Sequence, residues 1–196
     1  MFETTWELSS DKFWGISGNT FRGFRKHKKP SDQYRAWAPQ AYRYLAEIPE
    51  QRFDLAAIHE YLTNDLGGHW ANGVKQISIA HRFKIVDLFL LHMCRCAQLG
   101  GVKRRLIVAS ANPPLDKFTL IGLATLVPGL VVGNLAMGAI EDIGQYKALQ
   151  RVMEQITGQA GLPRLYFDVW CWPEKRRTDN GLPALSSRPA PILIRE

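Results

Sequence analysis

Apolar residues recur at helical spacing through most of the chain from Ser31 onward. The first such stretch follows one helix face: Tyr34, Trp37, Ala38, Ala41, Tyr44, Leu45 and Ile48. Ser31–Asp32 supplies polar residues that can cap this stretch, and Pro49 predicts its end. Pro39 lies inside it and predicts a division into two short helices, because proline removes a helical hydrogen bond.

Further along the chain, the same periodicity predicts more helices. An apolar stripe at Leu55, Ile58 and Leu62 predicts a helix that Gly67–Gly68 ends. The longest predicted helix spans 74–99 and stops at Gly100–Gly101. Two more are predicted over 141–157 and, from a shorter apolar run, over 165–172.

This pattern indicates a mostly α fold, without internal repeats or a regular strand–helix alternation. The chain has 196 residues, of which 46% are hydrophobic, so it is long and apolar enough to bury a core. We expect three parts. Residues 1–30 form an irregular N-terminal segment with a basic loop, residues 31–172 a helical core domain, and residues 173–196 a surface tail.

The stretch 118–140 contains no charged residue and is long enough to raise the possibility of a membrane span. Pro128–Gly129 and Gly133–Asn134 interrupt it twice, however. The piece before the first interruption is too short to cross a bilayer. We therefore predict a buried helix followed by a loop, and no membrane partner.

The formal net charge of +7 favours a polyanionic partner, either nucleic acid or an anionic membrane surface. Two basic groups are candidate phosphate contacts: Arg25, Lys26, Lys28 and Lys29, and Lys103, Arg104 and Arg105. The first group follows an aromatic cluster and forms either a solvated loop or a phosphate-contacting loop. The second opens a predicted loop, with a short strand or more loop at 106–108.

The cysteines and histidines do not form a recognisable metal site. The three cysteines are an odd number, which together with the lack of a secretory signal predicts a reducing, cytoplasmic location. Cys94 and Cys96 have no partner pair, and the five histidines lack ligand spacing, so we expect no metal and no cofactor. A Gly-x-Ser-x-Gly nucleophile elbow is also missing.

Asp116 is the residue around which the candidate chemistry is arranged. Pro113–Pro114 ends whatever precedes it, and the apolar residues from Phe118 onward predict a helix that starts at Asp116. One interpretation is an N-cap, because a carboxylate accepts hydrogen bonds from the first free N–H groups of a helix. The other is that the carboxylate stabilises a cationic sugar while a lysine attacks the sugar carbon of a nucleoside.

Three stretches carry a resemblance to a known family. Residues 17–22 (Ser-Gly-Asn-Thr-Phe-Arg) are similar to a Gly-Gln-Ser-Phe-Arg-Trp stretch, with Gly23 where tryptophan is usual. Residues 72–80 look like a degenerate hairpin, lacking Gly-x-Gly, that runs into a helix. Residues 114–116 (Pro-Leu-Asp) are similar to a Pro-Val-Asp motif. In this order the stretches resemble the helix-hairpin-helix DNA glycosylases, in particular the 8-oxoguanine DNA glycosylase branch.

The resemblance implies a helix-hairpin-helix glycosylase-like bundle with its site between two lobes. The implied activity is excision of a modified or damaged base from double-stranded DNA, in repair or in defence against phage with modified DNA. AP-lyase activity through a lysine Schiff base can accompany it. Lys75 is the best match to the nucleophile and Lys84 the alternative, while Asp116 caps a helix and assists departure of the base.

The resemblance also suggests where the base would be held. Gly18 matches the glycine that helps recognise the damaged purine. Phe13, Trp14 and Trp170 are candidate stacking groups, although ordinary core packing would explain each of them. Asp168 in the last apolar run is either paired or functional.

We expect the protein to be a monomer. The second interpretation, after the glycosylase, is a non-catalytic DNA-binding protein on the same scaffold. The third is a membrane-associated protein.

Overall fold

The computed structural model describes residues 16, 20–21, 24, 29–71, 77–130 and 137–172. The chain divides into two compact units, 1–111 and 112–196, and each is described by itself. The boundary falls inside the span 31–172 that was expected to form one helical core. All regular secondary structure in the described ranges is helical, which confirms the mostly α class.

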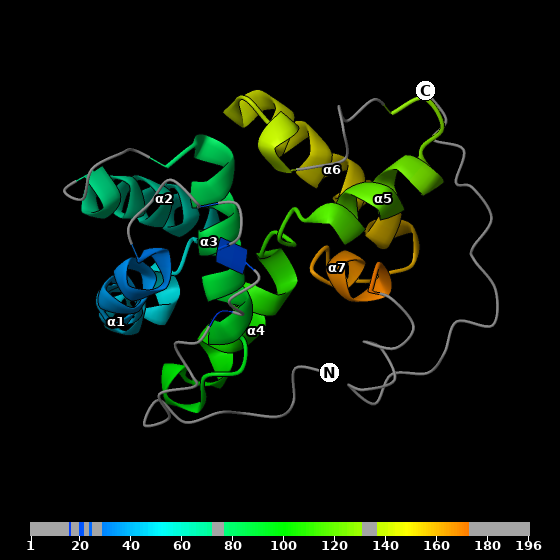
Figure 1. Ribbon diagram of the computed structural model, residues 1–196. Helices are drawn as coiled ribbons and strands as arrows, with labels where there is room; N and C mark the ends of the chain where they lie inside the picture. The colour runs from blue at the N-terminus through cyan, green and yellow to red at the C-terminus, as the bar shows by residue number, and fades with distance from the viewer. Residues whose placement is uncertain are drawn as a thin grey trace. The chain divides into compact units, whose positions relative to one another are not determined.

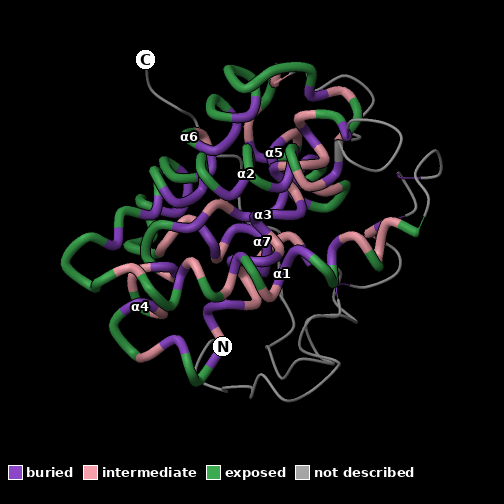
Figure 2. Tube along the Cα trace, turned by 90° about the vertical axis from the view of Figure 1, so that its left-hand side faces the viewer, coloured by how far each residue is buried: buried purple, intermediate pink, exposed green. Residues whose placement is uncertain are grey.

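Unit 1 is built from four α-helices and two short 3-10 helices within the described residues. The α-helices are α1 (Pro30–Glu47), α2 (Leu55–Ala71), α3 (Ile79–Met93) and α4 (Gly101–Ser110), with 3-10 turns at η2 (Glu50–Arg52) and η3 (Ala97–Leu99). Helix α2 packs against α1, α3 and α4, and α4 also packs against α3 (Figure 1). Buried positions recur along each helix, as expected for amphipathic helices around a shared core (Figure 2).

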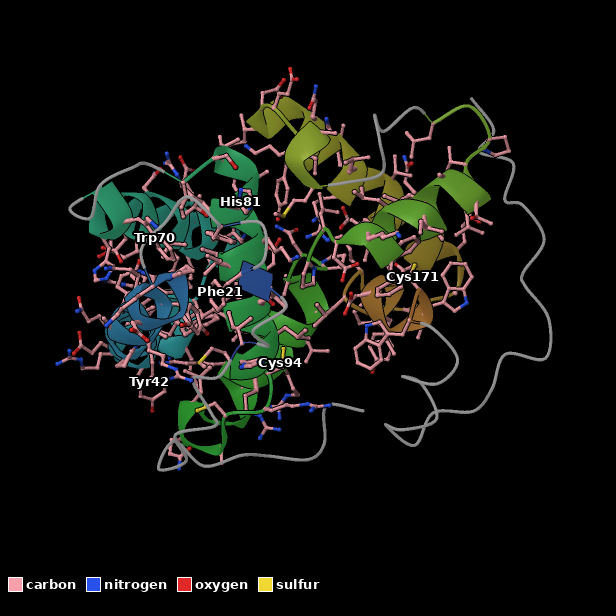
Figure 3. The ribbon with its side chains drawn as sticks, in the orientation of Figure 1. Phe21, Tyr42, Trp70, His81, Cys94 and Cys171 are labelled. Carbon is pink, nitrogen blue, oxygen red and sulfur yellow. The ribbon has the colours of Figure 1, made fainter. Side chains whose placement is uncertain are left out.

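The core of unit 1 is rich in aromatic side chains. Trp37 and Phe89 are fully buried, and their rings meet edge to face with centroids 5.2 Å apart. Trp37 Nε1 donates a hydrogen bond of 2.7 Å to Asp65 Oδ2, so its polar atom is satisfied. Phe24 also packs in this core, with its ring centroid 5.8 Å from that of Trp70 and 4.3 Å from that of His81. Figure 3 labels Trp70 and His81.

Helix α1 differs from its prediction at its start and in its middle. It begins at Pro30, with Lys29 as N-cap at φ 47°, rather than after a Ser31–Asp32 cap. It then continues through Pro39 as one helix. Buried side chains lie on both sides of the proline, including Trp37 before it and Leu45 after it. Burial of this continuous face offsets the hydrogen bond that the proline removes.

The glycines of α2 do not end it, contrary to the prediction. The helix runs through Gly67–Gly68 to Ala71. Leu66 and Trp70 are almost completely buried on either side of the glycines, so the apolar face continues across them. Tertiary packing therefore outweighs the poor helix propensity of glycine, which is about 1 kcal/mol per residue.

Helix α3 is shorter than the predicted 74–99. Ser78 is its N-cap and accepts a hydrogen bond from His81 N, while its hydroxyl lies 2.6 Å from His81 Nδ1. The helix ends at Met93, and the chain turns through η3 before Gly100. Gly100 has φ 84°, a conformation that favours glycine, and is the N-cap of α4 rather than the stop of a longer helix.

Unit 2 contains α5 (Lys117–Leu126), η4 (Met137–Ala139), α6 (Ile143–Gln159) and α7 (Tyr166–Trp170) among its described residues. Helix α7 packs on both α5 and α6. The predicted helices over 141–157 and 165–172 are confirmed to within a few residues. The uncharged stretch begins as the helix α5, which ends in a turn at 127–130. None of the described helices combines the length and apolarity that a membrane crossing requires.

Gly122 lets α7 approach α5 closely. A Cβ atom at this position would overlap Cys171 Sγ, and it would lie 3.4 Å from Cys171 Cβ. Figure 3 shows Cys171 in the region where α7 lies beside α5. The absence of a side chain at 122 is therefore part of the packing of unit 2.

We expect Gly122→Ala to lower the free energy of unfolding by about 1–3 kcal/mol through overpacking. Cys171→Ala in the same chain should recover most of this loss, because it removes the overlapping sulfur. Gly158→Ala is the matched control. It lies in α6 with nothing within 4 Å of its added Cβ, so it should stabilise by about 0.5–1 kcal/mol. Urea unfolding measures all four proteins, and an equal response at 122 and 158 would refute this account.

Candidate functional site

Asp116 is the N-cap of α5, which is one of the two interpretations that the sequence left open. Its Oδ1 accepts hydrogen bonds from Phe118 N at 2.8 Å and from Thr119 N at 3.1 Å. In return, the Thr119 hydroxyl oxygen accepts a hydrogen bond of 2.7 Å from Asp116 N. The two residues thus form a capping box. Asp116 is half-buried, and its Oδ2 receives no hydrogen bond from a described residue.

Two buried polar side chains hold the loop that leads to Asp116. Thr119 is fully buried, and its hydroxyl lies 3.2 Å from Pro114 O and 2.9 Å from Asp116 O, either of which can accept its proton. Gln150 on α6 is 3% exposed, and its Nε2 donates a hydrogen bond of 3.0 Å to Pro113 O. The amide oxygen Oε1 of Gln150 is buried and has no hydrogen-bond partner among the described residues. The position of Asp116 therefore depends on contacts from both α5 and α6.

Asp168 in α7 and Cys171, the C-cap of this helix, belong to the same unit as Asp116. Asp168 is 4% exposed, and its Oδ2 accepts a hydrogen bond of 3.0 Å from Trp172 Nε1. Trp170 is half-buried and packs its ring 5.7 Å from the Phe167 ring. The hydrogen bond of Asp168 and the ring contact of Trp170 fit the structural interpretations that the sequence left open for these two residues. Their roles in base binding stay predictions.

The cysteines are poor nucleophiles. Burial raises the pKa of the Cys94 thiol to about 12. Burial also raises the pKa of Cys171, and the negative charges of Asp168 and Asp116 raise it further. All three cysteines are free thiols in the structure. Because a thiolate is the reactive form, these thiols are unsuited to nucleophilic catalysis at neutral pH.

The two candidate nucleophiles belong to unit 1. Lys84 lies in α3 and is half-buried. Lys75 lies outside the described residues, together with the rest of the predicted hairpin. Asp116 belongs to unit 2, so the described geometry does not join either lysine to the carboxylate.

The basic group at 103–105 lies on α4, so the predicted loop and the possible strand at 106–108 are wrong. Lys103 is 7% exposed, and its Nζ donates hydrogen bonds to Leu45 O at 2.9 Å and Ala46 O at 2.7 Å. Arg104 Nε donates to Cys94 O at 2.9 Å, whereas Arg105 is exposed. The helix forms because its apolar face, including the buried Ile107, packs into the unit. Lys103 thereby caps the last turn of α1 instead of facing a phosphate.

We expect Lys103→Met to destabilise the protein by about 2–3 kcal/mol, because charged hydrogen bonds are lost and two carbonyl groups lose their donor. DNA affinity per folded molecule should stay unchanged. Arg105→Ala should show the reverse pattern, with weaker DNA binding and stability within about 0.5 kcal/mol of wild type. Urea unfolding and a salt titration of DNA binding separate the two effects. Loss of affinity in folded Lys103→Met would restore this lysine as a phosphate contact.

Several predicted site residues lie outside the described residues: Phe13, Trp14, Gly18, Arg25, Lys26 and Lys28. Lys29 is described and is exposed at the start of α1. Among the described residues, no group of three or more His, Cys, Asp and Glu side chains is arranged to hold a metal ion.

Sequence reasoning missed Thr119 and Gln150 as partners of the Asp116 loop. A signal for Thr119 was present, because a threonine three residues after an N-cap aspartate resembles the capping-box pattern. Gln150 was detectable as a polar residue next to Leu149 and Met153 on the apolar face of a helix. Its partner, the Pro113 carbonyl, is 37 residues away and had no sequence signal.

The comparisons with known proteins add no family assignment. No protein-family model, no curated protein and no solved structure matches this chain.

Proposed function

We propose that this protein is a DNA N-glycosylase that excises a modified or damaged base from double-stranded DNA. The observation that carries the proposal is the geometry of Asp116. One carboxylate oxygen is occupied by the N-terminus of α5, and the other receives no hydrogen bond from a described residue. This is the helix-capping arrangement that the resemblance implies for the residue that assists departure of the base.

In the proposed reaction, the nitrogen of a lysine bonds to C1′ of the nucleotide. The bond between C1′ and the base breaks, and the base leaves with the bonding electrons. Positive charge develops on the sugar, and the Asp116 carboxylate stabilises it. The nitrogen then gives one proton to the departing base and the other to O4′ as the C1′–O4′ bond breaks, which opens the sugar ring and leaves a Schiff base between C1′ and the lysine nitrogen. Lys75 is the first candidate for the nucleophile and Lys84 the second.

Charge also supports a DNA partner. The chain carries a formal net charge of +7, and Lys29, Arg105 and Lys117 are exposed in the described part. Exposed cations of this kind contact phosphates without reading sequence. The base must leave the stack before its glycosidic bond can be attacked. Aromatic residues near the N-terminus, Phe13 and Trp14, are the candidates to hold it there.

Borohydride trapping tests the proposal. The full-length protein is incubated with duplexes that each carry a different modified base, and sodium borohydride then reduces any Schiff base to a stable amine. We expect a covalent protein–DNA band for at least one base. The band should disappear in Lys75→Gln and persist in Lys84→Gln. The opposite pattern would assign the nucleophile to Lys84.

A parallel assay covers an enzyme that uses water as the nucleophile. Such an enzyme leaves an abasic site, which alkali converts to a strand break without any trapped band. Breaks without trapping would retain the glycosylase and remove the lysine step. If no modified base yields either product while the protein binds duplex DNA tightly, the glycosylase proposal fails. The non-catalytic DNA-binding function then replaces it.

A further inference from the structure

We propose that Thr119 and Gln150 are positioning residues that hold Asp116 in a catalytically competent orientation. The inference rests on the proposed function, because it assigns these two residues to the Asp116 site. Neither contacts the substrate in this proposal. Both act through the loop 112–115 and the first turn of α5.

Thr119 determines the backbone on both sides of the carboxylate. Its hydroxyl accepts from Asp116 N at 2.7 Å and lies within hydrogen-bond distance of Pro114 O and Asp116 O. Its own N–H donates to Asp116 Oδ1 at 3.1 Å. One fully buried side chain thus fixes the Asp116 backbone, while its amide helps fix the carboxylate. A nonpolar replacement of equal size would leave buried groups of this loop unsatisfied.

Gln150 anchors the same loop from a second helix. Its Nε2 donates to Pro113 O at 3.0 Å, three residues before Asp116. Proline residues 113 and 114 have no N–H, so the loop has few backbone donors of its own with which to fix its position. The Gln150 side chain is buried on α6, within the packed part of unit 2. This contact ties the entry to α5 to a helix remote in sequence.

The expected consequence is a defect in the chemical step rather than in DNA binding. Displacement of a catalytic group by about 1 Å can cost on the order of 100-fold in rate. Thr119→Val should therefore lower the single-turnover excision rate by about 10-fold to 100-fold with unchanged DNA affinity. Thr119→Ser, which keeps the hydroxyl, should restore most of the rate. Gln150→Met should show a smaller defect, since it removes one hydrogen bond.

The first experiment does not depend on activity. Amide hydrogen exchange of Phe118 reports whether Asp116 Oδ1 still accepts its hydrogen bond. We expect Thr119→Val to accelerate exchange of this amide by about tenfold or more, and Thr119→Ser to leave it protected. Thr157→Val is the matched control. It removes another buried hydroxyl, which bonds to Met153 O at 3.0 Å within α6, and should leave Phe118 protected.

The second experiment measures excision per folded molecule for the same variants. Unchanged Phe118 exchange in Thr119→Val would overturn the positioning role, whatever the activity. Altered exchange with a wild-type excision rate would also overturn it, because the orientation would then be irrelevant to the chemistry. If wild-type protein excises no base, the proposed function fails, and the exchange result still decides whether Thr119 holds the carboxylate.

Discussion

Replacing His59 by leucine is expected to lower the free energy of unfolding by about 2–3 kcal/mol, because it breaks a buried hydrogen bond to a carboxylate. His59 Nε2 lies 2.9 Å from Asp87 Oδ1 and donates to it. The pair joins α2 to α3. Asp87 is fully buried and His59 is 9% exposed, so water cannot replace the lost imidazole. The buried Asp87 carboxylate would then lack the hydrogen bond from His59.

A double-mutant cycle distinguishes the pair from ordinary packing. His59→Leu combined with Asp87→Leu should recover a large part of the loss, because the second change removes the buried carboxylate that the first leaves without this hydrogen bond. Glu60→Gln, an exposed carboxylate next to His59, is the control and should stay within about 0.5 kcal/mol of wild type. Urea unfolding followed by tryptophan fluorescence measures each variant. Strictly additive single losses would show that the two side chains are not coupled.

Asp116→Asn is expected to lower base excision by about 100-fold to 1,000-fold while leaving the fold intact. Asparagine caps a helix about as well as aspartate, so α5 keeps its start. The substitution removes the negative charge that would stabilise the sugar cation. Asp116→Ala should add a loss of about 1 kcal/mol in stability, because the cap is lost as well. Single-turnover excision and urea unfolding together separate the two roles.

Asp142 provides a matched control in the same unit. It is the N-cap of α6 and accepts a hydrogen bond of 2.9 Å from Gln145 N. Asp142→Ala should destabilise the protein about as much as Asp116→Ala, but excision per folded molecule should not change. If Asp116→Asn retains the wild-type rate, Asp116 is a helix cap and no more. An equal loss of excision in Asp142→Asn would point to a general electrostatic effect.

Local sequence patterns were sufficient to predict the helices with regular apolar spacing and, in the candidate site, the N-cap at Asp116. The predicted helices over 141–157 and 165–172 match α6 and α7 closely. The Asp116 cap was predictable because its signals lie within a few residues: two prolines before it and an apolar helix after it. Prediction failed where a residue with poor local propensity lies in a well-packed helix, as at Pro39 and Gly67–Gly68.

In the candidate site, too, contacts between near neighbours could be predicted and contacts between distant residues could not. Lys103 looked like a surface cation, yet its ammonium group is bound to Leu45 O and Ala46 O, 58 and 57 residues away. Gln150 likewise finds its partner only through the packing of α6 against the loop before α5. Such contacts depend on which backbone carbonyls remain unsatisfied after the helices pack. The type of a side chain does not indicate which of these carbonyl groups it will bind.

The sequence alone therefore determined the mostly α class and the capping role of Asp116. Each of these follows from composition or from hydrogen bonds between near neighbours in the chain. Only the tertiary structure decided that α1 and α2 run unbroken, that His59 pairs with Asp87 and that Gly122 must lack a side chain. The physical reason is that burial and long-range contacts outweigh the local propensities that oppose them, roughly 1 kcal/mol for each glycine of α2 and roughly 3 kcal/mol for Pro39 of α1.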